Sequence, residues 1–201
     1  MRRSLRPELA RAAAILARAA EDGGLRALTV TAAARGEGVT TITAHLAREL
    51  VEDLGLRVLL VDLADGQGGL AAALGGLAEP PARLAEGDVA ASTLRWALTG
   101  LAMPAEGAPA LRRRLDALLT AAAGRFDIVL VDAPPLPDGL AAMVAARACG
   151  QAVLVIRAGN LPIEELERLR DDLREARVQI LGTILNQRRE VVPAWIERLL
   201  R

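Results

Sequence analysis

The stretch ALTVTAAARGEGVTT, residues 27–41, decides the fold class of this chain. Its first part, residues 27–31, is a short apolar run with β-branched residues, which predicts a buried strand. The residues that follow have the spacing of a glycine-rich loop whose backbone N–H groups cradle phosphates: Gly36, Gly38, Thr40 and Thr41. Val39 stands where such a loop has its lysine. The sequence therefore predicts a strand, a phosphate-type loop and a helix, without the ammonium group that reaches the β and γ phosphates.

The composition offers no replacement for that lysine. All 25 basic residues are arginines, and the chain contains no lysine and no tyrosine. Arg35 lies beside the loop, but its planar guanidinium does not substitute for a compact ammonium group, and Glu37 adds a negative charge to the loop. Losing one charge-assisted contact of about 1.5–3 kcal/mol would weaken phosphate binding about ten- to a hundredfold. The helix N-terminus still attracts anions, so retained binding and lost binding both stay open.

Apolar runs alternate with helical patterns along the rest of the chain. Further strands are expected at residues 57–62, 94–103, 126–132, 152–157 and 179–186. Helices are expected at residues 7–21, 40–54, 110–122, 138–147 and 163–176, with short helices within 63–93. This alternation predicts an α/β fold with a doubly wound, mostly parallel sheet and helices on both faces. We expect one domain of 201 residues: an N-terminal helix and linker (1–24), a core (25–187) and a C-terminal helix (188–201).

Polar side chains end several of the predicted strands. Asp62 and Asp132 each follow a continuous apolar run, and Asn186 ends the last strand. The carboxyl ends of parallel strands share one crevice, so we expect these three residues to lie near the glycine loop. The two glycines would also serve a plain strand-to-helix turn, and the aspartates would also serve as caps of the next loops.

Charge and hydropathy argue against several other classes of protein. The 25 acidic residues balance the 25 basic ones, which argues against a broad nucleic-acid-binding surface. The apolar run Ala12–Leu16 is too short to span a membrane, and the first residues lack the pattern of a signal peptide. We therefore expect a cytoplasmic protein that binds no nucleic acid.

Together these motifs resemble the cytoplasmic domain of the bacterial tyrosine kinases of capsule and exopolysaccharide synthesis, within the deviant phosphate-loop ATPases. The matching blocks are, in chain order, the loop at 36–41, the second Walker element at 58–62, the Walker B block at 126–135 with Asp138 after it, and the strand near the adenine at 181–186. The family loop reads P-G-E-G-K-T-T, and this chain departs from it at Arg35 and Val39.

The resemblance implies a nucleotide site with roles for individual residues. Thr40, Asp62 and Asp132 would hold Mg²⁺, and the two aspartates would act on the metal and its water as the catalytic carboxylates. Mg-ATP or Mg-ADP would contact a larger set of residues: Arg35, Gly36, Glu37, Gly38, Thr40, Thr41 and, at the base, Asn186. Binding is expected to be weakened or lost because the lysine is absent.

Other departures from the family pattern also concern the chemistry. Ala64 stands where the second carboxylate of the family's D-A-D motif is expected, and Asp65 lies one position later. The family's oligomerisation pattern E-x-x-R-x-x-R is present only as Glu8-x-x-Arg11, with Ala14 in the third place. The tail carries no tyrosine cluster, so the family's autophosphorylation targets do not exist in this chain.

The resemblance and its departures predict a pseudoenzyme: a catalytically degenerate accessory protein of envelope polysaccharide synthesis and export. It would dock on a membrane co-polymerase, the chain-length determinant, at the inner face of the cytoplasmic membrane, with the helix that carries Glu8, Arg11 and Arg18 as its contact surface. It would also pair with an active kinase or with a second copy of itself. One alternative is an active ATP-dependent tyrosine kinase or ATPase of the same pathway, with Arg35 replacing the lysine. Another is a partition-type positioning ATPase, against which the missing lysine and the neutral charge argue.

Overall fold

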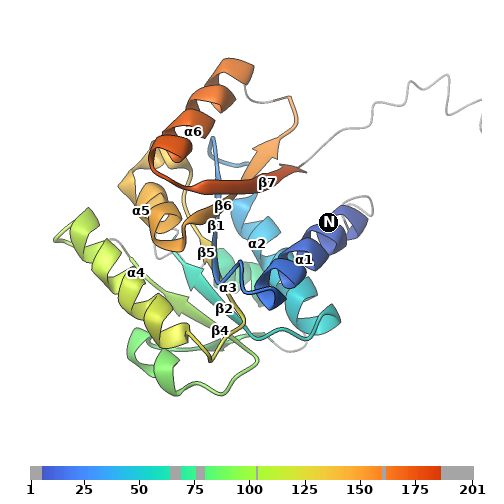
Figure 1. The fold of residues 1–201 in the computed structure, drawn as a ribbon, viewed down its shortest axis with the longest axis vertical. Coiled ribbons are helices and arrows are strands. Elements are labelled where there is room, and N and C mark those ends of the chain that lie inside the picture. The colour runs from blue at the N-terminus through green and yellow to red at the C-terminus, as the bar shows by residue number, and fades with distance from the viewer. Residues whose placement is uncertain (1–5, 64–68, 76–79, 103, 160–161, 187–201) are drawn as a thin grey trace, which may run out of the picture.

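A computed structural model of the protein describes residues 6–63, 69–75, 80–102, 104–159 and 162–186. Within these ranges seven strands form one sheet in the order β3-β4-β2-β5-β1-β6-β7, and every neighbouring pair is parallel (Figure 1). The strands are β1 (Ala27–Ala32), β2 (Val58–Asp62), β3 (Ala82–Arg83), β4 (Trp96–Gly100), β5 (Ile128–Asp132), β6 (Gln151–Arg157) and β7 (Gln179–Asn186). The predicted C-terminal helix at 188–201 and the pair Ala64-Asp65 lie outside the described residues.

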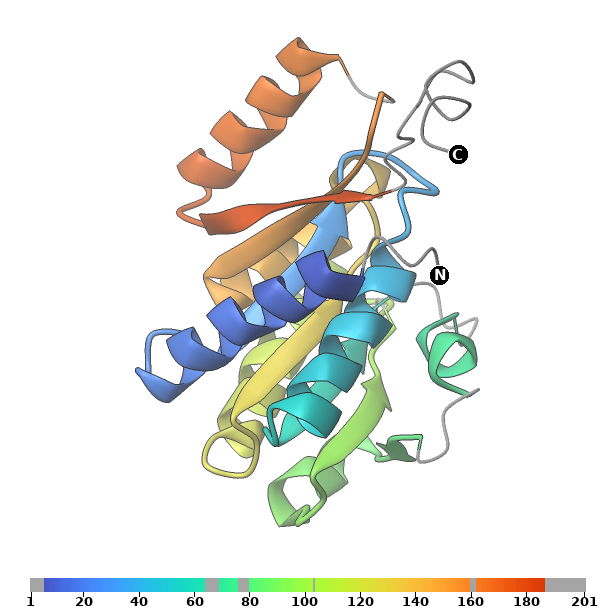
Figure 2. The same cartoon turned by 90° about the vertical axis from the view of Figure 1, so that its right-hand side faces the viewer.

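Helices cover both faces of this sheet, as the two views in Figures 1 and 2 show. One face carries α1 (Arg6–Glu21), α2 (Val39–Arg48) and α3 (Gly69–Leu74). The other face carries α4 (Ala108–Ala122), α5 (Leu140–Cys149) and α6 (Ile163–Glu175). Shorter helical turns are η1 (Glu49–Asp53), η2 (Glu86–Ala91) and η3 (Leu136–Asp138). The predicted α/β fold with a parallel sheet between two helical layers is therefore confirmed.

The central strands β2 and β5 are apolar up to their terminal aspartates, and β1 is apolar except for the buried Thr29 and Thr31, because each of these strands faces two cores. Val58 and Leu60 of β2 pack beneath α1 and α2, whereas Leu59 and Val61 pack on the side of α4 and α5. Successive side chains of a strand point to opposite faces of the sheet, so a strand with both faces covered must be continuously apolar. This requirement explains why the strands β1, β2 and β5 could be predicted from apolar residues in the sequence.

The structure differs from the sequence-based expectations at two elements, the helix expected over residues 40–54 and the segment 63–93. The helix expected over residues 40–54 ends as an α-helix at Arg48 and continues as the π-helical turn η1. The two-residue strand β3 lies in a segment for which the sequence predicts only short helices. β7 pairs with β6 alone and forms one edge of the described sheet, with an irregularity in its pairing opposite residues 152–153.

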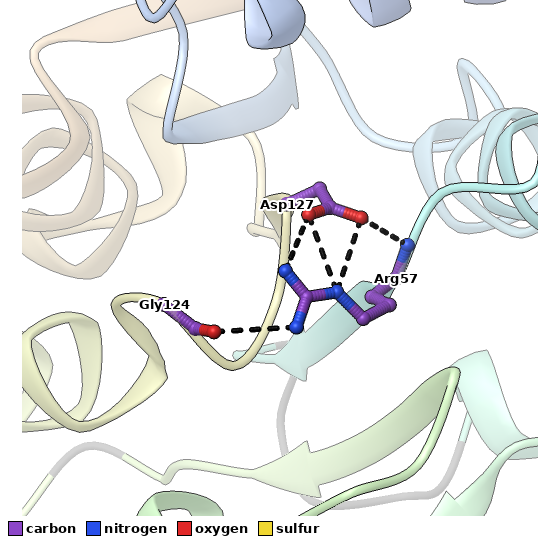
Figure 3. Close-up of polar contacts among 3 residues, drawn as sticks. All are labelled: Arg57, Gly124 and Asp127. Atoms are coloured by element: carbon purple, nitrogen blue, oxygen red, sulfur yellow. Dashed lines mark hydrogen bonds and ion pairs between the residues drawn. The ribbon is translucent and has the colours of Figure 1, made fainter.

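An ion pair joins the amino ends of the central strands β2 and β5 (Figure 3). The glycine loop lies at the other end of the strands, beyond their carboxyl ends. The Asp127 carboxylate accepts a hydrogen bond from the Arg57 backbone N–H at 2.7 Å and from its Nη2 at 2.6 Å. Arg57 Nη1 also donates to the Gly124 carbonyl at 3.2 Å. The hydrogen bonds from Arg57 hold the pKa of Asp127 below its usual range. Asp127 therefore stabilises the fold, and it lies far from the candidate site.

Candidate functional site

A cavity of about 720 Å³ lies at the carboxyl ends of the strands, where the glycine loop leaves β1. The loop forms one wall with residues 34–41, and the opposite wall comes from residues 133–135 after β5 and residues 138–141 at the start of α5. Parallel α/β sheets place their ligand sites at this position, beyond the strand ends. The volume falls within the range of small-ligand pockets, roughly 300–1,000 Å³.

The loop turns through two glycines with positive φ angles. Gly36 has φ 76° and Gly38 has φ 90°, a left-handed conformation that residues with a Cβ adopt rarely. α2 begins directly after Gly38, and no side chain caps its first turn. Thr40 and Thr41 lie in this first turn, whose N–H groups have no partner within the helix and carry its partial positive charge. The loop and helix end therefore form an anion-accepting surface made of backbone.

Val39, in the place of the lysine, is almost fully buried at 9% exposure and belongs to the core on the α1–α2 face. Its carbonyl accepts a hydrogen bond from the side-chain hydroxyl of Thr43, one helical turn later, at 3.0 Å. Its side chain thus contributes packing to the first turn of α2 and no charge to the cavity. The cationic side chain that lines the cavity, within the described ranges, is Arg35.

Asp132 is a fully buried carboxylate at the end of β5, and its partner in the parallel register is Asp62 at the end of β2. Asp132 Oδ1 accepts a hydrogen bond from Thr43 Oγ1 at 3.2 Å, whereas Oδ2 has no hydrogen-bond partner within the described structure. Burial, the largest cause, and the negative charge of Asp62 together raise the pKa of Asp132 to about 7, against the hydrogen bonds from the hydroxyls of Thr40 and Thr43, which lower it.

An orphaned carboxylate oxygen beside a threonine hydroxyl and a second carboxylate suits a hard cation. Mg²⁺ prefers oxygen ligands and is commonly held by one or two carboxylates together with substrate phosphates. No group of three or more His, Cys, Asp or Glu side chains able to hold a metal occurs in the described part of the chain. The donors Thr40, Asp62 and Asp132 therefore fit a metal that enters with an anionic ligand better than a metal held by protein alone.

Arg35 and Asp138 bridge the two walls of the cavity. The distance from Arg35 Nε to Asp138 Oδ2 is 2.8 Å, and the arginine side chain is 77% exposed. The guanidinium therefore lies at the solvent side of the loop and is engaged with a carboxylate. An ion pair this exposed has a small net effect on stability, about 0–1 kcal/mol, so Arg35 can exchange partners at little cost.

Glu37 lies in the loop, but its side chain is enclosed by protein at 1% exposure. Oε2 accepts hydrogen bonds from the backbone N–H groups of Ala33 and Ala34, and Oε1 accepts one from that of Arg157. The Glu37 carbonyl accepts a further bond from Asn186 Nδ2 at 2.7 Å. The negative charge that the sequence places in the loop is thus bound by backbone donors.

The site residues named from the sequence fall into two groups in the structure. Arg35, Gly36, Glu37, Gly38, Thr40 and Thr41 all border the large cavity. Asp62 instead lines a smaller adjoining cavity of about 350 Å³, and Asn186 contacts the loop from the β7 side. The roles inferred for these residues stay predictions.

Two neighbours of the site were missed by the sequence reasoning. Thr43 donates to Asp132, and its position three residues after Thr40, on one face of the predicted helix, was the available signal. Arg83 lines the adjoining cavity together with Asp62. It lies on β3, for which the sequence gives no strand signal, so no sequence pattern would have placed it there.

Comparison with known proteins places the chain among distant relatives of bacterial tyrosine kinases. No protein-family model matches it. It is 26% identical over 179 residues to the tyrosine-protein kinase CpsD of Streptococcus agalactiae, across 84% of this chain and 78% of that protein. The solved structure of the BceF tyrosine kinase domain superposes with a TM-score of 0.64 at 26% identity, covering 90% of this chain and 79% of that domain.

A second group of similar structures belongs to the MinD-type ATPases. The septum site-determining protein MinD of Pyrococcus horikoshii, solved with Mg-ADP, superposes with a TM-score of 0.56 at 24% identity, covering 87% of this chain and 77% of that one. At this identity the likeness concerns the fold alone. The chain is thus distantly homologous to bacterial tyrosine kinases and has the fold of phosphate-loop ATPases.

Proposed function

We propose that this protein is an accessory or regulatory relative of the bacterial tyrosine kinases that act in capsule and exopolysaccharide synthesis, with a nucleotide cleft that no longer supports efficient phosphoryl transfer. The observation that carries this proposal is the buried Val39 at the first position of α2, together with the buried Asp132 carboxylate, whose Oδ2 has no hydrogen-bond partner in the described structure. The oxygen donors that would hold the metal are present, and the lysine that would neutralise the phosphate charge is absent.

Mg-ADP or Mg-ATP is the ligand class that these groups suit. The backbone of residues 36–41 would receive the phosphates, Thr40, Asp62 and Asp132 would hold Mg²⁺, and Asn186 would lie on the side of the base. When bound, the metal would supply positive charge between the phosphates and the carboxylates. Without the lysine, the loop binds phosphate through amide dipoles only, so the affinity is lower than in a lysine-containing loop.

Phosphoryl transfer should suffer more than binding. This reaction depends on positioning and on neutralising charge that spreads over the transferred group. In the described cleft, Arg35 is the available cation, and it is paired with Asp138. The chain also contains no tyrosine of its own to receive a phosphate.

The second candidate function is an active kinase or ATPase that modifies another protein of the pathway. The observation that favours it is again Arg35, which borders the cavity and is exposed enough to turn from Asp138 toward a bound phosphate. A partition-type positioning ATPase is the third candidate. It draws support only from the shared fold of the MinD-type structures.

We further propose that α1 is the surface through which the protein docks on a membrane co-polymerase, at the inner face of the cytoplasmic membrane. Glu8, Arg11 and Arg18 are exposed on α1, and Ile15 between them is 62% exposed. No helix in the described residues has the length and apolarity to cross a membrane. A second copy of the chain, or an active kinase, would be the other partners of this surface.

Calorimetric titration with ADP and with ATP, each with and without Mg²⁺, tests the proposal. We expect binding that requires Mg²⁺, together with ATP turnover at the level of the protein-free control. Substantial ATP hydrolysis that Asp62→Ala abolishes would overturn the accessory role and support the active kinase. Absence of binding for both nucleotides, at millimolar concentrations and with Mg²⁺ present, would remove the nucleotide cleft from the proposal.

A further inference from the structure

The Glu37 carboxylate binds the start of its own loop and the end of a distant strand at the same time. Its Oε2 lies 3.2 Å from the Ala33 nitrogen and 3.3 Å from the Ala34 nitrogen, at the junction of β1 and the loop. Its Oε1 lies 3.4 Å from the nitrogen of Arg157, the last residue of β6. The side chain thus links the end of β1 to the end of β6, which lies 120 residues after Glu37 in the sequence.

Asn186 completes this link from β7. Its Nδ2 donates to the Glu37 carbonyl at 2.7 Å, and its side chain is buried against the loop. A Cβ atom built on Gly38 would lie 2.4 Å from the same nitrogen, which is closer than real Cβ contacts. Gly38 is therefore needed twice, once for its φ of 90° and once to leave room for the amide of Asn186.

The arrangement decides which N–H groups remain for a ligand. A carboxylate only accepts hydrogen bonds, so the amides of Ala33 and Ala34 are directed at Glu37 and not at the cavity. The donors left for an anion belong to the later part of the loop and the first turn of α2. A buried carboxylate is costly unless it is hydrogen-bonded, and these backbone contacts are what stabilise it here.

We propose that Glu37 and Asn186 are positioning residues that hold the loop in its phosphate-accepting shape before any ligand binds. The inference rests on the proposed nucleotide cleft. In it, both side chains support the loop from the protein interior. A loop that is already ordered loses less conformational freedom on binding, which favours affinity. The anion affinity then depends on Asn186, a residue of the edge strand β7, as well as on the loop itself.

Whether Glu37→Gln strengthens or weakens anion binding distinguishes a positioning role of Glu37 from simple electrostatic repulsion. If Glu37 acted as a negative charge beside the phosphates, Glu37→Gln would strengthen binding of tripolyphosphate and of Mg-ADP. A positioning role predicts weaker binding. The glutamine NH₂ group is a donor, so it would face backbone N–H groups from which the carboxylate now accepts hydrogen bonds. We expect about tenfold weaker binding for Glu37→Gln and for Asn186→Ala, measured by calorimetry. Glu167→Gln, an exposed change on α6, is the control and should bind as the wild type does.

Amide hydrogen exchange tests the link without any ligand. In the free wild-type protein the amides of Ala33 and Ala34 should be protected, and Glu37→Gln should speed their exchange at least tenfold while the amides of β2 stay protected. Fast exchange of these two amides in the wild type would overturn the inference even if nucleotide binds. Unchanged or tighter anion binding in either variant would overturn it as well. If Glu37→Gln fails to fold, Asn186→Ala carries the test with tripolyphosphate, which has no base for Asn186 to contact, because this variant changes no charge and removes one donor.

Discussion

Asp62 and Asp132 lie opposite each other in the register of the adjacent parallel strands β2 and β5, yet their environments differ: Asp132 is fully buried and Asp62 is partly exposed. Two carboxylates so placed disfavour each other's ionisation, and the buried one is affected most. Burial is accordingly the largest cause that raises the pKa of Asp132 to about 7, and the charge of Asp62 acts in the same direction. A divalent cation between them would reverse that effect.

The first prediction concerns the pH dependence of stability. The folded pKa of Asp132 is about 7 and the ordinary value is 3.8, so the folded state binds this proton more tightly than the unfolded state does. Stability from this group is fully present below about pH 4 and is lost as the pH rises through about 7, by on the order of 4 kcal/mol. Asp132→Asn keeps the shape without the titration. Its free energy of unfolding, measured by urea denaturation, should exceed that of the wild type increasingly between pH 5 and pH 8. A constant difference across that range would contradict the prediction.

The second prediction is that Mg-ADP binding releases a proton near neutral pH. A cation at Asp132 favours the ionised carboxylate, so the group should lose its proton when the metal binds. Calorimetry at pH 6.5 in two buffers of different ionisation enthalpy should give apparent binding enthalpies that differ in the direction of proton release. The difference should vanish in Asp132→Asn if that variant still binds, and should persist in Asp138→Asn. Equal enthalpies for the wild type in both buffers would show that this carboxylate does not meet the metal.

The third prediction concerns the missing cation. Val39→Lys should raise the affinity for Mg-ADP about ten- to a hundredfold, because one charge-assisted contact contributes about 1.5–3 kcal/mol. Some stability should be lost, since Val39 is packed in the core under α1 and α2. Val39→Met is the matched control, because it has a long unbranched side chain without charge and should give no gain in affinity. A gain that both variants share would point to the shape of the loop and not to charge.

The fourth prediction concerns the Arg57–Asp127 pair. Arg57→Met should cost about 1–2 kcal/mol of unfolding free energy, because it removes a multiply hydrogen-bonded, partly exposed pair. Asp127→Ala should cost more, since it also leaves the Arg57 backbone N–H without its acceptor. Arg112→Met, which removes an exposed i,i+4 pair with Asp116, should cost no more than about 0.5 kcal/mol. Equal losses for the two arginine variants would contradict the assignment of Asp127 to the frame of the fold.

Strands with two covered faces could be predicted from the sequence because burial forces a continuous apolar run. β2 and β5 show this, and the position of their carboxyl ends follows from parallel topology alone. β3 could not be predicted, since two exposed residues after a pair of prolines carry no periodicity. The π-helical end of α2 was equally hidden, because its residues keep the apolar pattern of the helix before it.

Side-chain partners far apart in sequence could not be predicted either, in the site or outside it. Asp127 lies 70 residues from Arg57, and Glu37 meets groups 120 and 149 residues away. A negative residue in a phosphate-type loop suggests repulsion of anions when only its neighbours are known. Its carboxylate is bound by backbone N–H groups after β1 and at the end of β6, and its carbonyl by Asn186 at the end of β7. The chain reaches β6 and β7 much later. The protonation of Asp132 likewise depends on burial, which its own segment does not encode.

The last prediction concerns α1 as a docking surface. Leu9, Ala13 and Leu16 of this helix are buried against the core, so its packing leaves the opposite side available. That side carries Arg11 and the exposed Ile15, an apolar residue with a charge one helical turn before it. In cells that contain the polysaccharide co-polymerase, we expect the protein in the membrane fraction, and Arg11→Glu combined with Ile15→Asp should move it to the soluble fraction.

Arg113→Glu is the matched control for this experiment, since Arg113 is an exposed arginine on α4, on the other side of the sheet. It reverses the same charge and should leave the protein with the membrane. The free energy of unfolding should be nearly unchanged in both variants because the substituted side chains are exposed. Wild-type protein that distributes identically in cells with and without the co-polymerase gene would contradict docking altogether. Release by Arg113→Glu as readily as by the α1 variant would show that net charge, and not the α1 surface, governs the association.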